Sequence, residues 1–152
     1  MNNDIVPEVF LELEYTGYIP DEYISEAIDK MEVYKKIAAV TEIKELEQLH
    51  GDLNDRFGPI PELVISLLSI SEIRLLCNQL AISSLREKNG VVTIEFSQIQ
   101  RISMEKVMRA LTESQGSIRI DSNKPNCLFI ETGNIGLKEK SEFLSERLRA
   151  LV

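Results

Sequence analysis

The sequence is poor in residues that build cross-links and metal centres. Its 152 residues include two cysteines, one histidine and no tryptophan. Cys77 and Cys127 lie far apart, in an apolar helical stretch and an apolar strand, and neither has a Cys-x-x-Cys spacing. We therefore expect both to be core thiols in a reducing cytosol, not a disulfide or a redox pair.

Long apolar runs and nucleotide-binding loops are also missing. No stretch is apolar enough to span a bilayer, and residues 1–5 lack a basic or apolar leader, so we expect a soluble cytoplasmic protein without a membrane partner. There is no GxxxxGK(S/T) loop and no GxGxxG after a strand. The glycines of residues 133–136 have the wrong spacing for either and are interpreted as a plain loop. No nucleotide motor is therefore expected within this chain.

His50 is the sole histidine, so a histidine-based catalytic or metal site would depend on one residue. It follows Leu49 in an apolar helical stripe, which favours a partly buried or surface position on a helix. No paired carboxylates in a predicted cleft and no activated nucleophile accompany it. We expect no catalytic residues, no metal and no cofactor; a small enzyme using His50 is kept as an alternative.

Acidic charge is concentrated in the first part of the chain. The formal net charge is −8, and residues 1–60 hold 14 of the 25 acidic residues but only 5 of the 17 basic ones. Such a surface repels phosphate backbones and suits a basic protein surface. The composition, 43% hydrophobic and 28% charged, is that of a globular chain, and its length suits one domain over residues 1–152.

The first half predicts one strand and three helices. Residues 9–15 alternate in their later part like a half-buried strand. Asp21 is expected to cap a helix that runs to about Val40, with the helical spacing carried by Ile24, Ala27, Ile28, Met31, Lys35 and Ala38. Thr41 is expected to cap a second helix that ends at Gly58. Pro61 then opens a third helix, apolar nearly all round, which we interpret as the buried spine.

The second half predicts the order ββαββα. Asn89-Gly90 between strands 84–88 and 91–96 is a strong hairpin signal. A short helix capped by Ser103 follows, then strands 117–121 and 126–131. A last helix begins near residue 137 and places Leu144, Leu148 and Leu151 on one face. The predicted fold class is α+β: an N-terminal strand and helical half, then a mainly antiparallel sheet with helices packed on it.

The second helix carries the candidate binding residues. At about 100° per residue its leucines fall on one side, and on the other lie Glu45, Gln48, Asp52, Asp55 and Arg56. Acids near a helix C-terminus oppose the macrodipole, at a cost of about 0.3–1 kcal/mol each. The five residues are therefore predicted to form a docking face for Arg or Lys of a partner. A solvated face in which Arg56 neutralises one neighbour is the alternative.

Three segments together carry a family resemblance. They are IPDEYI at 19–24, YKKIA at 34–38 and DLNDRFGPIP at 52–61, and in this order they resemble the C-terminal (TRCF) domain of bacterial transcription-repair coupling factor. The resemblance covers essentially all 152 residues. The family often has glutamate at the position of Asp52, so this chain presents that carboxylate on a shorter side chain.

The resemblance implies a non-catalytic regulatory domain of a larger ATP-driven DNA translocase. In the family, this domain packs on the UvrB-like N-terminal module of the same protein, masks the UvrA-binding surface and restrains the motor until stalled RNA polymerase is engaged. Acidic positions that match Asp52 and Asp55 lie at that contact. A nucleic-acid-binding accessory domain is the other alternative, but the basic residues that it would use are scattered among acids, without interleaved stacking aromatics: Arg86, Lys88, Arg101, Lys106, Arg109 and Arg119.

Overall fold

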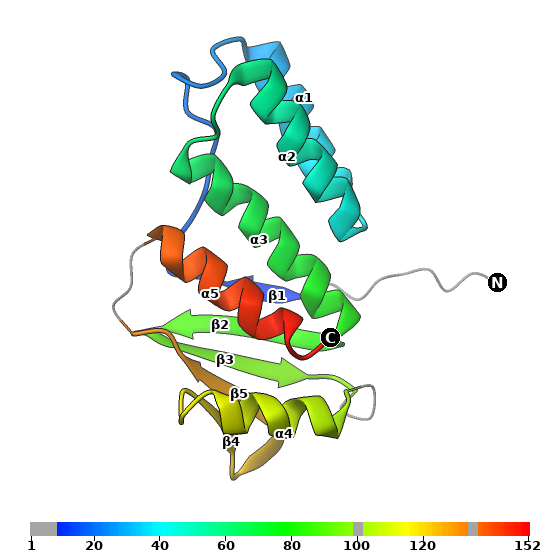
Figure 1. The fold of residues 1–152 in the computed structure, drawn as a ribbon, viewed down its shortest axis with the longest axis vertical. Helices are drawn as coiled ribbons and strands as arrows, with labels where there is room; N and C mark the ends of the chain where they lie inside the picture. Colours follow the sequence, from blue (N-terminus) through cyan, green and yellow to red (C-terminus); the bar gives the residue numbers. More distant parts are fainter. Residues whose placement is uncertain (1–8, 99–101, 134–136) are drawn as a thin grey trace, which may run out of the picture.

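The computed structural model of the chain describes residues 9–98, 102–133 and 137–152. It is an α+β fold in which a pair of helices, α1 and α2, is joined by a long helix, α3, to a five-stranded sheet (Figure 1). The predicted element order is confirmed. The elements are β1 (Phe10–Glu12), α1 (Ala27–Ala39), α2 (Ile43–Phe57), α3 (Glu62–Gln79), β2 (Ile82–Lys88), β3 (Val91–Phe96), α4 (Met104–Glu113), β4 (Ile118–Asp121), β5 (Lys124–Glu131) and α5 (Leu137–Arg149).

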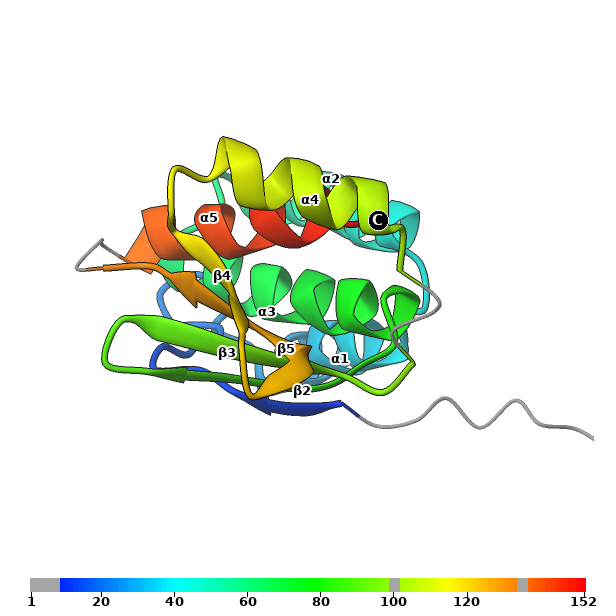
Figure 2. The same cartoon turned by 90° about the horizontal axis from the view of Figure 1, so that it is seen from below.

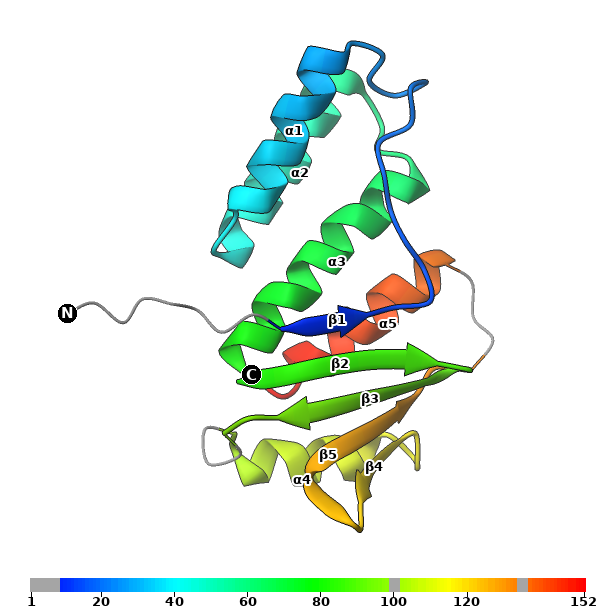
Figure 3. The same ribbon diagram turned by 180° about the vertical axis from the view of Figure 1, so that it is seen from behind.

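The sheet has the strand order β1-β2-β3-β5-β4, and Figure 3 shows it from its open face. β1 pairs with β2 in parallel, and the other three pairings are antiparallel. The tight β2–β3 turn has positive φ at both Asn89 (53°) and Gly90 (78°), the conformation that an Asn-Gly hairpin favours. The predicted hairpin is therefore confirmed.

Strand β1 is shorter than the alternation over residues 9–15 predicts, because the chain leaves the sheet after Glu12. It then runs up to the helical half and passes close to α3 at Gly17. A Cβ on Gly17 would lie 2.3 Å from the backbone nitrogen of Leu67. Since contacts under about 3 Å cannot be accommodated without a shift of backbone, glycine is required at this crossing.

Helices α3, α4 and α5 lie on one face of the sheet (Figure 2). In β3, buried residues alternate with partly buried ones, and the buried strand residues join a core cluster with helical leucines. Leu144, Leu148 and Leu151 belong to this cluster, as the predicted face of the last helix requires. Ser103 caps α4 by accepting a hydrogen bond from the Lys106 backbone N–H at 3.3 Å.

A second core cluster holds the helical half together. It contains Val33 and Ile37 of α1, Leu46, Leu49 and Leu53 of α2, and Val64, Leu68 and Leu75 of α3. Helix α3 also supplies Ile73, Leu76 and Cys77 to the sheet cluster, and Leu80, its C-cap, belongs to the same cluster. The interpretation of this helix as a buried spine is thus confirmed: it is apolar on several sides because it is packed in two cores.

Helix α1 differs from its prediction in both its start and its buried face. It begins at Ala27, because residues 21–23 form a turn in which Asp21 pairs with Lys30 and does not cap a helix. Its buried residues are Val33 and Ile37, whereas Ile28 is 81% exposed. This short helix has two apolar stripes, one with Ile28 and one with Val33 and Ile37. Packing against α2 and α3 buries the second.

Burial of the two cysteines leads to a direct prediction. Both thiols are free and buried. Burial raises the pKa of Cys77 to about 12 and also raises that of Cys127. We expect neither to react with dithiobis(nitrobenzoate) at pH 8 in the folded protein and both to react in urea, measured by absorbance of the released thiolate. Rapid reaction of the folded chain would contradict the burial of these thiols.

The raised pKa of Cys77 also determines how its contribution to stability changes with pH. The unfolded Cys77 loses its proton near pH 8.5, whereas the folded residue keeps it to about pH 12. The unfolded state therefore binds fewer protons in this window, and the contribution of Cys77 to stability falls as pH rises through it.

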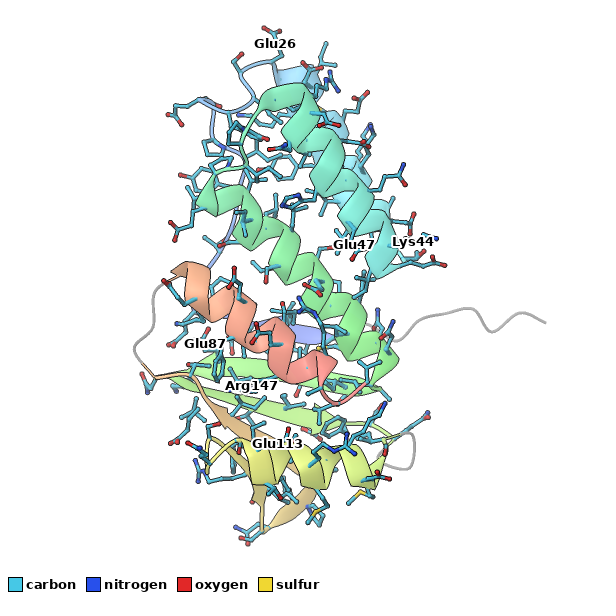
Figure 4. All side chains as sticks on the ribbon, in the orientation of Figure 1. Glu26, Lys44, Glu47, Glu87, Glu113 and Arg147 are labelled. Carbon is cyan, nitrogen blue, oxygen red and sulfur yellow. The ribbon has the colours of Figure 1, made fainter. Side chains whose placement is uncertain are left out.

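One ion pair is buried between the sheet and its covering helix. The side chain of Glu87 on β2 has 0% exposure, and its Oε2 lies 2.8 Å from Nζ of Lys140 on α5, which is 15% exposed. Its Oε1 accepts a hydrogen bond of 2.9 Å from the Glu14 backbone N–H. Glu87, labelled in Figure 4, therefore ties together the segment after β1, strand β2 and helix α5 through these two contacts.

Within the described part of the chain, no helix has the length and apolar character needed to cross a membrane.

Candidate partner-binding site

Helix α2 is held by its apolar side and presents its other side to solvent. Leu46, Leu49 and Leu53 are 6%, 7% and 2% exposed. The structure brings the five predicted residues together on one exposed surface of this helix, which we call the acidic face: Glu45, Gln48, Asp52, Asp55 and Arg56. The helical projection of the sequence therefore placed all five on the solvent side correctly.

Glu45 has a local structural role. Its Oε1 accepts hydrogen bonds from the backbone N–H groups of Thr41 at 2.9 Å and Glu42 at 3.0 Å, and from the Thr41 hydroxyl at 3.1 Å. These hydrogen bonds hold the pKa of Glu45 below its usual value, and those donated by Thr41 have the largest effect. The N-cap is Glu42 in a capping box with Glu45, so the prediction of Thr41 as the N-cap is wrong by one residue.

Arg56 is also engaged inside the domain. Its guanidinium lies 3.1 Å from Oδ1 of Asp29 and 3.4 Å from Oε1 of Glu32, both on α1. It also stands over the ring of Phe57 at 4.8 Å from the centroid. Arg56 therefore ties α2 to α1. The acids that it neutralises come from another helix, which the projection of α2 alone could not reveal.

Gln48, Asp52 and Asp55 are the remaining members of the acidic face. Within the described residues, none of the three side chains makes a hydrogen bond or ion pair with the protein. Asp52 and Asp55 are one turn apart on the same side of α2, at its C-terminal half. Because the helix dipole disfavours acids there, these two carboxylates are the best placed to gain from a cation brought by another molecule.

Tyr23 braces the C-terminal end of α2, a role that sequence reasoning missed. Its hydroxyl lies 3.1 Å from the Leu53 carbonyl and 2.9 Å from that of Gly58, both hydrogen-bond acceptors. Its ring packs on that of Phe57 with 5.8 Å between centroids. Burial raises the pKa of Tyr23. The two separated sequence segments 19–24 and 52–61 are thus joined in space, and they fix the end of the helix that carries Asp52 and Asp55.

The described basic residues of the nucleic-acid-binding alternative are divided between the open face of the sheet and helix α4. Arg86 lies over the ring of Phe10 at 4.5 Å and Arg119 over that of Phe129 at 5.5 Å, on the open face of the sheet. These two rings come from other strands, so the expected lack of interleaved aromatics in the sequence did not reveal them. Lys106 and Arg109 lie on α4, and Arg109 pairs with Glu105. Arg101 lies outside the described residues.

The one histidine is exposed on α2 and lies away from the acidic face, toward α3. Among the residues that the structure describes, no group of three or more His, Cys, Asp or Glu side chains is arranged to hold a metal ion. The arrangement on α2 can offer carboxylates and an amide to a partner, which is recognition chemistry.

Comparison with known proteins identifies the family of the chain. The family model of the TRCF domain matches residues 13–107. A transcription-repair-coupling factor of Borreliella burgdorferi is 32% identical over 95% of this chain, one of Haemophilus influenzae is 31% identical over 73%, and one of Staphylococcus aureus is 33% identical over 60%. The chain spans 13%, 10% and 8% of the lengths of these relatives.

A solved structure has the same fold. It is described as the crystal structure of the C-terminal domain of transcription-repair coupling factor, and it matches with a TM-score of 0.77 and 28% sequence identity. The match covers 93% of this chain and 92% of the other. The similarity thus extends over both the helical half and the sheet.

Proposed function

Because the chain belongs to the TRCF domain family, we propose that it is a non-catalytic, autoinhibitory interaction domain of a transcription-repair coupling factor. Its direct partner is the UvrB-like N-terminal module of the same parent protein, and docking masks the UvrA-binding surface of that module. The docked domain also restrains the translocase until stalled RNA polymerase is engaged. No direct nucleic-acid contact is assigned to it.

The proposal rests on two carboxylates of helix α2 that have no partner among the described residues. Asp52 and Asp55 are exposed and have no partner among the described residues, whereas Glu45 and Arg56 are already bound within the domain. A rigid helix with a capping box and a braced end holds both groups in fixed positions. Pre-organised carboxylates lose little entropy when an Arg or Lys binds to them.

A regulatory contact of this kind has to be reversible. Contacts between domains of one chain are of moderate area and partly polar. The tether supplies an effective concentration that reaches the millimolar range for short linkers, so that a weak intrinsic affinity is enough. A partner that binds one face then opens the contact by mass action.

The proposal is tested by titration calorimetry of this chain into the isolated UvrB-like module at about 50 mM and about 500 mM salt. Since the Debye length shrinks steeply over that range, binding through the acidic face is expected to weaken markedly at the higher salt. Binding that is equally strong at both salt concentrations would count against the acidic face as the docking surface.

A further inference from the structure

A groove crosses the domain on the side away from the acidic face. It has a volume of about 740 Å³, and its lining residues come from α2, α3 and α5: Ile43, Leu46, Glu47, His50, Ile65, Leu68, Ser69, Glu72, Glu142, Ser145 and Arg149. Helix α3 contributes to both core clusters, whereas the buried leucines of α2 belong to one cluster and those of α5 to the other. The groove therefore runs along the junction of the two cores, with α2 and α5 as its walls.

The groove combines an apolar part with an acidic part. Ile43, Leu46, Ile65 and Leu68 supply aliphatic surface from α2 and α3. The rest of the lining is polar, with three glutamates, one arginine, one histidine and two serines, and Arg149 is held by Glu72 through bonds of 2.8 and 3.1 Å. The hydrogen bond to Glu72 is the main cause that raises the pKa of Arg149. That pair is neutral in sum, so the groove keeps the net negative charge of the other two carboxylates.

Those two carboxylates stand on opposite walls. Glu47 is exposed on α2 and Glu142 is exposed on α5, and neither side chain makes a hydrogen bond or ion pair with the described part of the protein. Figure 4 shows Glu47 between α2 and α3. Glu142 also contributes, after Glu72, to the electrostatic attraction that raises the pKa of Arg149. Glu47 has no such interaction with a cation among the described residues. Both carboxylates are suited to a cation that enters between the walls.

We propose that this groove binds a basic amphipathic helix of a partner protein, with its apolar side chains on the aliphatic floor and its Lys or Arg residues between Glu47 and Glu142. Charge complementarity and the helical walls identify this occupant, because an amphipathic helix in a groove buries its apolar face and leaves its charged flanks at the rim. The surface is separate from the one proposed for the UvrB-like module. Glu47 and Asp52 are five residues apart on α2 and point about 140° apart.

The test uses this 152-residue chain and a synthetic helical peptide of leucine and lysine, with leucines at positions i, i+3, i+4 and i+7. Affinity is followed by fluorescence anisotropy, and the contacted surface by amide chemical shifts. We expect the double variant Glu47→Lys/Glu142→Lys to bind about tenfold more weakly or worse. A control variant with the same net charge, Glu22→Lys/Glu113→Lys, changes two exposed acids outside the groove and is expected to bind like the parent.

A second probe separates charge from apolar burial. The same peptide with every lysine replaced by glutamate is expected to lose binding, because the rim would then repel it. Three results would overturn the proposal: equal weakening by the control variant, shifts confined to the acidic face, or undiminished binding of the glutamate peptide. The first of these would mean non-specific electrostatic association only. Because the chain alone is tested, failure here leaves the docking of the acidic face unaffected.

Discussion

Changing Asp52 and Asp55 together to alanine is expected to weaken binding to the UvrB-like module by about 30-fold, which corresponds to about 2 kcal/mol. Both carboxylates are exposed and unpaired in the free domain, so their contribution arises only when a cation of the partner reaches them. The measurement is the dissociation constant from calorimetry at low salt. An unchanged constant would remove both residues from the docking face.

The free energy of unfolding is the control measurement for this double variant. Because no interaction within the described residues depends on Asp52 or Asp55, the double variant should unfold within about 0.5 kcal/mol of the parent in urea. The helix dipole makes a slight stabilisation the expected direction. A second control, Glu22→Ala with Glu113→Ala, removes two exposed acids elsewhere and should keep the parent affinity.

The second large effect concerns stability. Glu87→Gln is expected to lower the free energy of unfolding by about 3–5 kcal/mol, because it leaves the Lys140 ammonium without its buried partner. Glutamine keeps an oxygen for the Glu14 N–H, so the change isolates the charge. Urea unfolding followed by circular dichroism measures the difference. A loss below about 1 kcal/mol would mean that the pair is effectively solvated.

A surface pair serves as the comparison. Glu105 and Arg109 on α4 are 3.3 Å apart, with 81% and 61% of their side chains exposed. Glu105→Gln removes the same charge from an i, i+4 pair, and we expect a loss of only about 0.3–0.5 kcal/mol. Both variants replace glutamate with glutamine. The difference between their losses in unfolding free energy therefore reflects the burial of the ion pair.

Much of the fold follows from local signals. The Asn89-Gly90 hairpin, the Ser103 cap and the three leucines of the last helix occur where the sequence predicts them, because each depends on residues close together in the chain. The apolar character of α3 is likewise explained by burial in two cores. At these positions, residues close together in the chain were enough to predict the structure.

Other features depend on contacts between distant segments. The start and buried face of α1 were predicted wrongly, because Ile28 and Val33 lie on competing stripes and only packing on α2 and α3 decides between them. Strand β1 ends early because the chain must pass α3 at Gly17. No pattern within either segment contains this information.

The sequence predicted only part of the candidate site. Projection of one helix correctly placed Asp52 and Asp55 on the solvent side. It could not show that Arg56 is bound by acids of α1, or that Tyr23 closes the end of α2. The groove lined by Glu47 and Glu142 was not predicted, because it exists only where three helices meet.

The most direct test of the proposed masking is a competition experiment on the UvrB-like module. Labelled UvrA is first bound to the isolated module, and this chain is then added at increasing concentration. The account predicts that the chain displaces UvrA and that the Asp52→Ala/Asp55→Ala variant does so much less. A ternary complex, in which the chain binds the module while UvrA stays bound with unchanged affinity, would contradict it.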